Sequence, residues 1–201
     1  MEVLNFFPVE FFVFKNKLID NSKLIAELEA LDNVEIKKTT TISLLVDLKK
    51  HEKFKELFSW FEECLEEIRQ TMKYDCDKFE ITNSWVNVAL PKYYMHQNYH
   101  KHSMSFYSAV YYFTEGSSTE FEDVVIDRTR AQLEVLRHEY QPWETIVPEP
   151  GKLVIFPSYV YHRSHAHTDN TSRYILSFNT LPSGKINYQL ATDSKAHIKV
   201  V

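Results

Sequence analysis

Six of the nine histidines fall in two short stretches of the sequence. The stretches are His96, His100 and His102, and then His162, His165 and His167. In an extended strand, residues two apart point to the same side, so His100 and His102 can present both imidazoles to one metal ion. A lone histidine is more often an ordinary core or surface residue. A pair with a distant third partner therefore indicates a metal site more strongly than any single histidine does.

An arginine in an apolar segment follows the second histidine stretch. His162 follows the buried-looking segment 152–156, and Arg173 stands eleven residues further on, in the run 172–179. Strand alternation places Arg173, Ile175 and Ser177 on one face. An inward arginine is costly to bury unless it meets an anion. The alternative is an arginine at the rim that pairs with a surface carboxylate.

The remaining clustered histidines are weaker candidates. His96 lies four residues before His100, which is a metal spacing in helices, but Pro91 and the neighbouring aromatic residues make a helix there improbable. His165 and His167 could extend the site or bind a second metal ion. We expect them instead to be solvated loop residues.

The elements that must position these side chains change in character along the chain. Residues 9–14 predict a strand, and Asn21 and Ser22 offer N-caps for a helix that ends near Asp32. A stripe of apolar residues at steps of three and four predicts a longer helix at 52–74, packed in the core. Short β-rich runs follow, separated by turn residues. The predicted strands are 79–90, 105–113, 119–126, 131–140, 144–147, 151–156, 159–163 and 172–179.

Eight short strands at this spacing predict a mainly β fold of the jelly-roll type, with N-terminal helices that buttress it. We expect one domain over 1–201, divided into 1–78, a strand with helices, and 79–190, the jelly-roll core.

Composition excludes several classes of protein. The chain has 201 residues, of which 44% are hydrophobic and 25% charged, as in soluble globular proteins. Only three glycines are present, which rules out a P-loop or a dinucleotide fingerprint. The net charge of −5 argues against a protein that coats nucleic acid with a broad basic face, and leaves only a local basic groove open for such a partner. Cys64 and Cys76 have no zinc-site spacing and indicate a reducing compartment. The start of the sequence lacks the basic residues of a signal peptide, and no long apolar segment is present. We therefore expect a cytoplasmic protein without a membrane partner. Its oligomeric state stays open.

Together, four pieces of the sequence resemble the iron(II)- and 2-oxoglutarate-dependent oxygenases, most closely the branch found in marine bacteria and their phages. The resemblance covers roughly residues 83–180. The pieces are Trp85-Val-Asn-Val, His100-Lys-His leading to Ser108-Ala-Val-Tyr-Tyr-Phe, Phe156-Pro-Ser-Tyr-Val-Tyr-His-Arg, and Arg173-Tyr-Ile-Leu-Ser-Phe-Asn.

The resemblance implies a double-stranded β-helix, the cupin-like form of the jelly roll, and a set of site residues. His100, His102 and His162 would bind Fe(II). Arg173 would hold the far carboxylate of 2-oxoglutarate through a bidentate pair, with Tyr112 and Ser177 as further contacts.

The sequence departs from the family pattern at His102, where the broader family has Asp or Glu and so binds iron through two histidines and one carboxylate. Either three imidazoles hold the metal, which we favour, or His102 lies outside the ligand set. In the second case a nearby acid would supply the oxygen ligand, the candidates being Glu120, Glu122 and Asp123.

The activity implied is that of a dioxygenase. It would consume O₂ and 2-oxoglutarate, release succinate and CO₂, and hydroxylate a C–H bond of a protein side chain or small metabolite. A three-histidine non-heme dioxygenase that does not use 2-oxoglutarate is the first alternative, with Arg173 free to bind a substrate carboxylate. A non-catalytic, metal-binding cupin-like protein is the second.

Overall fold

The computed structural model describes residues 8–31, 41–44, 48–92, 97–124, 143–189 and 194–200. The helices are α1 (Asn21–Ala30) and α2 (Lys55–Thr71), the latter preceded by two short 3₁₀ turns (Leu48–Lys50 and Glu52–Phe54). The strands are β1 (Phe12–Lys15), β2 (Thr41–Leu44), β3 (Lys78–Ala89), β4 (Tyr107–Tyr112), β5 (Thr119–Glu122), β6 (Trp143–Ile146), β7 (Lys152–Pro157), β8 (His162–Ser164), β9 (Arg173–Ile186) and β10 (Ala196–Ile198).

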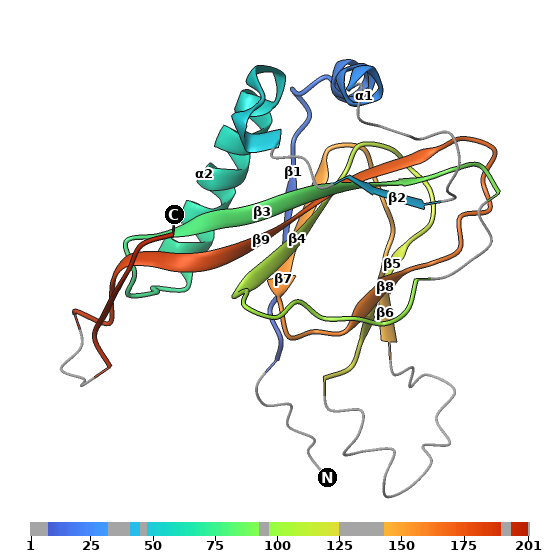
Figure 1. Cartoon of the computed structure of the whole chain (residues 1–201). Coiled ribbons are helices and arrows are strands. Elements are labelled where there is room, and N and C mark those ends of the chain that lie inside the picture. Colours follow the sequence, from blue (N-terminus) through green and yellow to red (C-terminus); the bar gives the residue numbers. More distant parts are fainter. Residues whose placement is uncertain are drawn as a thin grey trace, which may run out of the picture.

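The described strands form a larger and a smaller antiparallel sheet (Figure 1). The larger sheet has the order β1-β7-β4-β9-β3-β2, with β10 paired to the distal part of β9. The smaller sheet has the order β6-β5-β8. His100 extends the smaller sheet through an isolated bridge to His162. Helices α1 and α2 cover the face of the larger sheet that points away from the smaller sheet (Figure 1). This arrangement confirms the predicted jelly roll with N-terminal helices.

Strand β9 shows how the layers are built. Tyr174, Leu176 and Phe178 belong to the apolar cluster that includes the buried side chains of α1 and α2. The alternate residues Arg173 and Ile175 face the smaller sheet, because successive side chains of a strand point to opposite sides. The β9 backbone pairs with both β3 and β4, which fixes the register of the whole face.

The predicted helices form close to their expected bounds, with one correction at a cap. The apolar stripe of α2 is buried as expected, at Leu57, Phe61 and four further positions. Helix α1 is capped by Asp20 and not by Asn21 or Ser22, because the Asp20 carboxylate accepts from the backbone N–H groups of Ser22 and Lys23. Neither described helix is both long and apolar enough to cross a membrane.

The predicted strands need more correction than the helices. Residues 158–160 form a turn, and the strand predicted at 159–163 runs instead over β8. Strand β9 continues to Ile186, beyond the predicted end at 179, because the long strand β3 pairs with it. Strands β2 and β10 were not predicted. The strand predicted at 131–140 lies outside the described residues.

Candidate active site

Three histidines converge between the two sheets. His100 and His162 face each other across a backbone pair, in which each N–H donates to the other residue's carbonyl, at 3.0 and 2.9 Å. His102 follows two residues later, and its Nε2 lies 3.3 Å from Nε2 of His162. One nitrogen from each imidazole lies within 4.8 Å of one from the others. Among the described residues, this is the one cluster of histidine, cysteine or acidic side chains close enough to hold a metal ion.

Backbone carbonyls orient two of the rings. Nδ1 of His100 lies 3.0 Å from the carbonyl of Asn98, and Nδ1 of His162 lies 3.0 Å from the carbonyl of Val160. A carbonyl can only accept, so each Nδ1 carries the proton and donates it. Each Nε2 therefore keeps its lone pair, as a metal ligand requires.

Burial keeps two of these histidines uncharged. It lowers the pKa of His162 to about 3 and, together with the nearby His100, the pKa of His102 to about 4. Both imidazoles are thus neutral at physiological pH and need lose no proton to bind a cation.

The donor set fits a first-row divalent metal ion. Imidazole suits iron, and two nitrogens bound to one ion at about 2.1 Å cannot be more than about 4.2 Å apart. The 3.3 Å between Nε2 of His102 and Nε2 of His162 meets this condition. The three ligand nitrogens lie within 4.8 Å of one another, so the ring of His100 would need at most a small shift to meet it as well.

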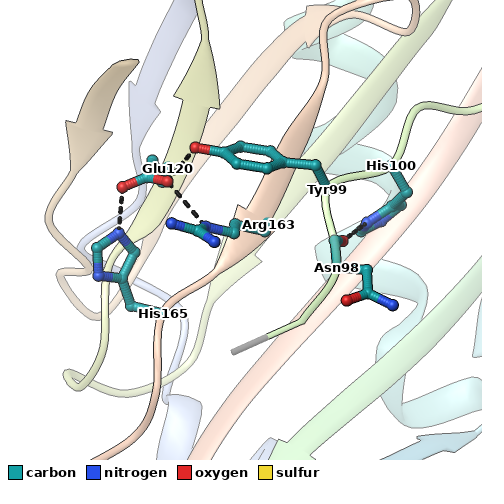
Figure 2. Close-up of polar contacts among 6 residues, drawn as sticks. All are labelled: Asn98, Tyr99, His100, Glu120, Arg163 and His165. Atoms are coloured by element: carbon teal, nitrogen blue, oxygen red, sulfur yellow. Dashed lines mark hydrogen bonds and ion pairs between the residues drawn. The ribbon is translucent and has the colours of Figure 1, made fainter. Parts of the chain in front are cut away.

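Glu120, the most buried of the acids considered as alternative ligands, is engaged elsewhere. Its neighbours on β5 point toward the interior: Phe121 packs its ring 4.9 Å from that of Phe156, and Thr119 accepts from Tyr112. Glu120 therefore projects from the opposite face of the smaller sheet, where it pairs with Arg163 and His165 (Figure 2).

Arg173 lies inside the fold and not at its rim. It is 1% exposed, and its Nη1 donates to the backbone oxygen and hydroxyl of Ser117 at 2.9 and 2.8 Å. Its Nε is buried with no hydrogen-bond partner among the described residues. Burial lowers the pKa of this guanidinium, although Tyr112 opposes the shift. A buried cation with an unused donor is suited to an anion that enters the fold.

Gly116 makes room for this arginine. Its φ is +137°, and a Cβ there would lie 3.1 Å from Cγ and Cδ of Arg173 and 3.1 Å from Cε1 of His167. His167 is consequently 1% exposed, which corrects the expectation that it is a solvated loop residue. The loop between β8 and β9 packs against the loop between β4 and β5. A local sequence pattern cannot predict this contact, because the two loops lie far apart in the chain.

Tyr112 and Ser177 occupy the same interior face as Arg173. The hydroxyl of Tyr112 donates to Oγ1 of Thr119 at 2.7 Å. Burial raises the pKa of Tyr112 to about 12, so its phenol remains a hydrogen-bond donor at neutral pH. Ser177 is 5% exposed and lies opposite both Val110 and Trp85 in the sheet.

One pocket is lined by the three histidines together with Ser177 and with Thr119, the hydrogen-bond partner of Tyr112. The space that it encloses is about 30 Å³, close to the volume of one water molecule, so a larger ligand would extend through its open mouth. Four of its polar lining residues were not predicted as site residues: Asn87, Gln97, Thr119 and Ser164. Alternation along β5 could have indicated Thr119, because it is two residues from the interior Phe121. The lining comprises Trp85, Asn87, Gln97, His100, His102, Val110, Thr119, His162, Ser164, Ile175 and Ser177.

His165 is not part of the metal-ion cluster. His165 is one third exposed, and its Nε2 donates to Glu120 at 2.7 Å, so it is not simply a solvated residue. His96 lies outside the described residues.

Several solved structures share this fold. A prolyl-4-hydroxylase from Pseudomonas putida is 14% identical, with a TM-score of 0.59 over 88% of this chain and 94% of that one. HygX from Streptomyces hygroscopicus, solved with nickel and 2-oxoglutarate, is 10% identical, with a TM-score of 0.58 over 96% and 93%. SnoN, an α-ketoglutarate-dependent epimerase from nogalamycin biosynthesis, is 11% identical, with a TM-score of 0.64 over 89% and 81%. At these identities the likeness concerns the fold.

The sequence itself carries a family match. No curated protein matches the chain. A family model described as "Putative 2OG-Fe(II) oxygenase" matches residues 83–179, a range that contains the three clustered histidines, Tyr112 and Arg173. The narrower branch from marine bacteria and phages stays a prediction. Residues 83–179, just under half of the chain, match the 2OG-Fe(II) oxygenase family.

Proposed function

We propose that the protein is an Fe(II)- and 2-oxoglutarate-dependent hydroxylase that acts on a C–H bond of a protein side chain or small metabolite and releases succinate and CO₂. The observation that carries this proposal is the convergence of three imidazoles on a pocket whose lining includes Ile175 and Ser177, on the same strand as a buried arginine with an unused donor.

His100, His102 and His162 would hold the metal ion as three neutral ligands. When bound, Fe(II) supplies the sites for O₂ and 2-oxoglutarate and the oxidising power for decarboxylation and hydroxylation. Because no protein carboxylate joins the set, these ligands offset none of the charge of the metal ion. An anionic co-substrate is therefore bound more strongly than it would be beside a carboxylate.

The far carboxylate of 2-oxoglutarate would bind Arg173. A guanidinium can form two parallel hydrogen bonds to a carboxylate, and burial strengthens the attraction by excluding water. Tyr112 would donate to the same carboxylate by turning its hydroxyl from Thr119. Ser177, which lines the pocket, is the third proposed contact.

The walls of the pocket keep water from the reacting groups. Val110 and Ile175 line it and belong to a buried apolar cluster with Phe121 and Phe156. This cluster leaves the open mouth as the route for the prime substrate. Similar folds include a prolyl-4-hydroxylase and HygX with hygromycin B bound, so the substrate is not fixed by the fold.

Anaerobic titration with Fe(II) and then 2-oxoglutarate tests the proposal. We expect a weak visible charge-transfer band when 2-oxoglutarate chelates the metal ion in the wild type. Arg173→Ala should weaken 2-oxoglutarate binding by about 100-fold or more, because a hydrogen-bonded ion pair is lost. Lys78→Ala is the control, since it removes an exposed cation from the larger sheet.

Each other outcome has a defined meaning. If Fe(II) binds but no band forms, the 2-oxoglutarate assignment is wrong and a three-histidine dioxygenase without 2-oxoglutarate takes its place. If the band forms but no succinate is produced under O₂ with any substrate tested, hydroxylation is contradicted. If Fe(II) does not bind, the metal site itself is contradicted.

A further inference from the structure

A buried carboxylate on the outer face of the smaller sheet joins the two segments that carry the paired histidines. Glu120 is 2% exposed, although it points away from the pocket. Figure 2 shows its carboxylate between Tyr99, Arg163 and His165. Arg163 Nε donates to Oε1 at 2.8 Å, His165 Nε2 donates to Oε2 at 2.7 Å, and the hydroxyl of Tyr99 donates to Oε1.

The partners of Glu120 are the sequence neighbours of the proposed ligands. Tyr99 directly precedes His100, and Arg163 directly follows His162. Since side chains alternate along extended chain, holding Tyr99 and Arg163 outward directs both imidazoles inward. The guanidinium of Arg163 also lies over the ring of Tyr99, 4.4 Å from its centre.

The backbone alone holds these segments over a short length. Strand β8 has three residues. The segment with His100 is not a regular strand and pairs with β8 at an isolated bridge. A short pairing of this kind leaves the twist and separation of the two segments easily changed. Outside the bridge, the backbone adds single hydrogen bonds, from the N–H of Gln97 to the carbonyl of Ser164 at 3.2 Å and from the N–H of His102 to the carbonyl of Ser158 at 3.1 Å. An attachment on the outer face would restrict the remaining freedom.

Glu120 is suited to this task because it is charged and fully paired. Burial alone would raise its pKa, but the hydrogen bonds from Tyr99, His165 and Arg163 outweigh it and hold the pKa below the ordinary value. Its ionised form accepts all three hydrogen bonds at once, which a neutral amide cannot do.

We propose that Glu120 is a positioning residue for the metal centre, which fixes the separation and ring orientation of His100 and His162 by holding Tyr99 and Arg163 on the outer face. The inference rests on the proposed function, because it assumes that these histidines bind the metal ion. Glu120 itself touches neither metal ion nor substrate.

Co(II) binding to the full-length protein tests the proposal, since the visible bands of Co(II) report the geometry of its ligands. Glu120→Gln keeps the volume but replaces one acceptor with a donor. We expect it to weaken Co(II) binding by about 10- to 100-fold, the range seen when residues behind metal ligands are changed, and to alter the visible spectrum. Tyr99→Phe should shift both in the same direction by a smaller amount. Glu144→Gln, which removes an exposed carboxylate from the same sheet, should change neither.

Folding is checked by circular dichroism and melting temperature. A folded Glu120→Gln variant with wild-type Co(II) affinity and spectrum would overturn the proposal, even if its melting temperature were lower. If this variant does not fold, Tyr99→Phe decides in the same way. If wild-type protein does not bind Co(II), or binds it equally well after His162→Ala, the proposed metal site is contradicted instead.

Discussion

The two faces of the larger sheet are built from the same strands but bury different chemistry. On the helix side, Leu176 and Phe178 of β9 pack with Phe61 of α2, whose ring centre lies 4.9 Å from that of Phe178. On the other side, Arg173 and Ser177 of the same strand are buried toward the smaller sheet. One face is a continuous apolar core, and the other combines a small apolar cluster with polar groups.

This difference separates the source of stability from the source of function. Apolar burial on the helix side contributes free energy without any partner, whereas an uncompensated cation or a neutral buried imidazole contributes none until a ligand is bound. The site face is therefore expected to be weaker when empty and to gain stability from its ligands. The predictions below test how far the two faces act independently.

The largest effect is expected on the helix face. Phe61→Ala should lower the free energy of unfolding by about 3–5 kcal/mol, because a fully buried ring is replaced by a cavity. Urea unfolding measures this loss. The remaining folded protein should bind Fe(II) and 2-oxoglutarate with nearly wild-type affinity, and a loss above about tenfold would show that the faces are coupled.

An intermediate effect is expected on the site face when the pH changes without metal. Burial holds the pKa of His162 at about 3, whereas the unfolded chain takes up this proton below about pH 6.5. Between these values the unfolded state binds more protons, so the free energy of unfolding falls as the pH falls. At pH 5 this one group should cost about 2 kcal/mol relative to pH 7.5.

Urea unfolding in the presence of EDTA at both pH values measures this cost. Other groups of the protein also respond to pH, so His162→Gln supplies the comparison. The pH dependence of the variant should be smaller by about the same 2 kcal/mol. Equal slopes for both proteins would contradict a buried neutral His162.

The smallest effect is expected at the phenol of Tyr112. Tyr112→Phe should weaken 2-oxoglutarate binding about tenfold, the value of one hydrogen bond to a charged group, and change the melting temperature little. Competition between 2-oxoglutarate and its analogues, followed by the charge-transfer band, gives the affinity. An unchanged affinity would remove Tyr112 from the co-substrate contacts and leave it as a partner of Thr119 alone.

The candidate ligands, the face on which Arg173 lies and the packing of the longer helix could all be predicted from residue types and spacing. The spacing of His100, His102 and His162, the alternation around Arg173 and the apolar stripe of α2 were all readable from residue types, because period and side-chain chemistry are local properties. The resemblance to the oxygenase family rested on four pieces within residues 83–180, which include these histidines and Arg173 but no part of α2.

The burial of Arg173 and the direction of Glu120 depend on tertiary packing and could not be predicted from local patterns. Whether Arg173 lay at the rim or inside depended on Gly116 and the β4–β5 turn packing against it. The position of Glu120 depended on the pairing of β5 with β8, since a candidate metal ligand in sequence becomes an outer-face partner of Arg163 once the register is fixed. Facing, burial and pairing arise from segments far apart in the chain, and only their packing sets them.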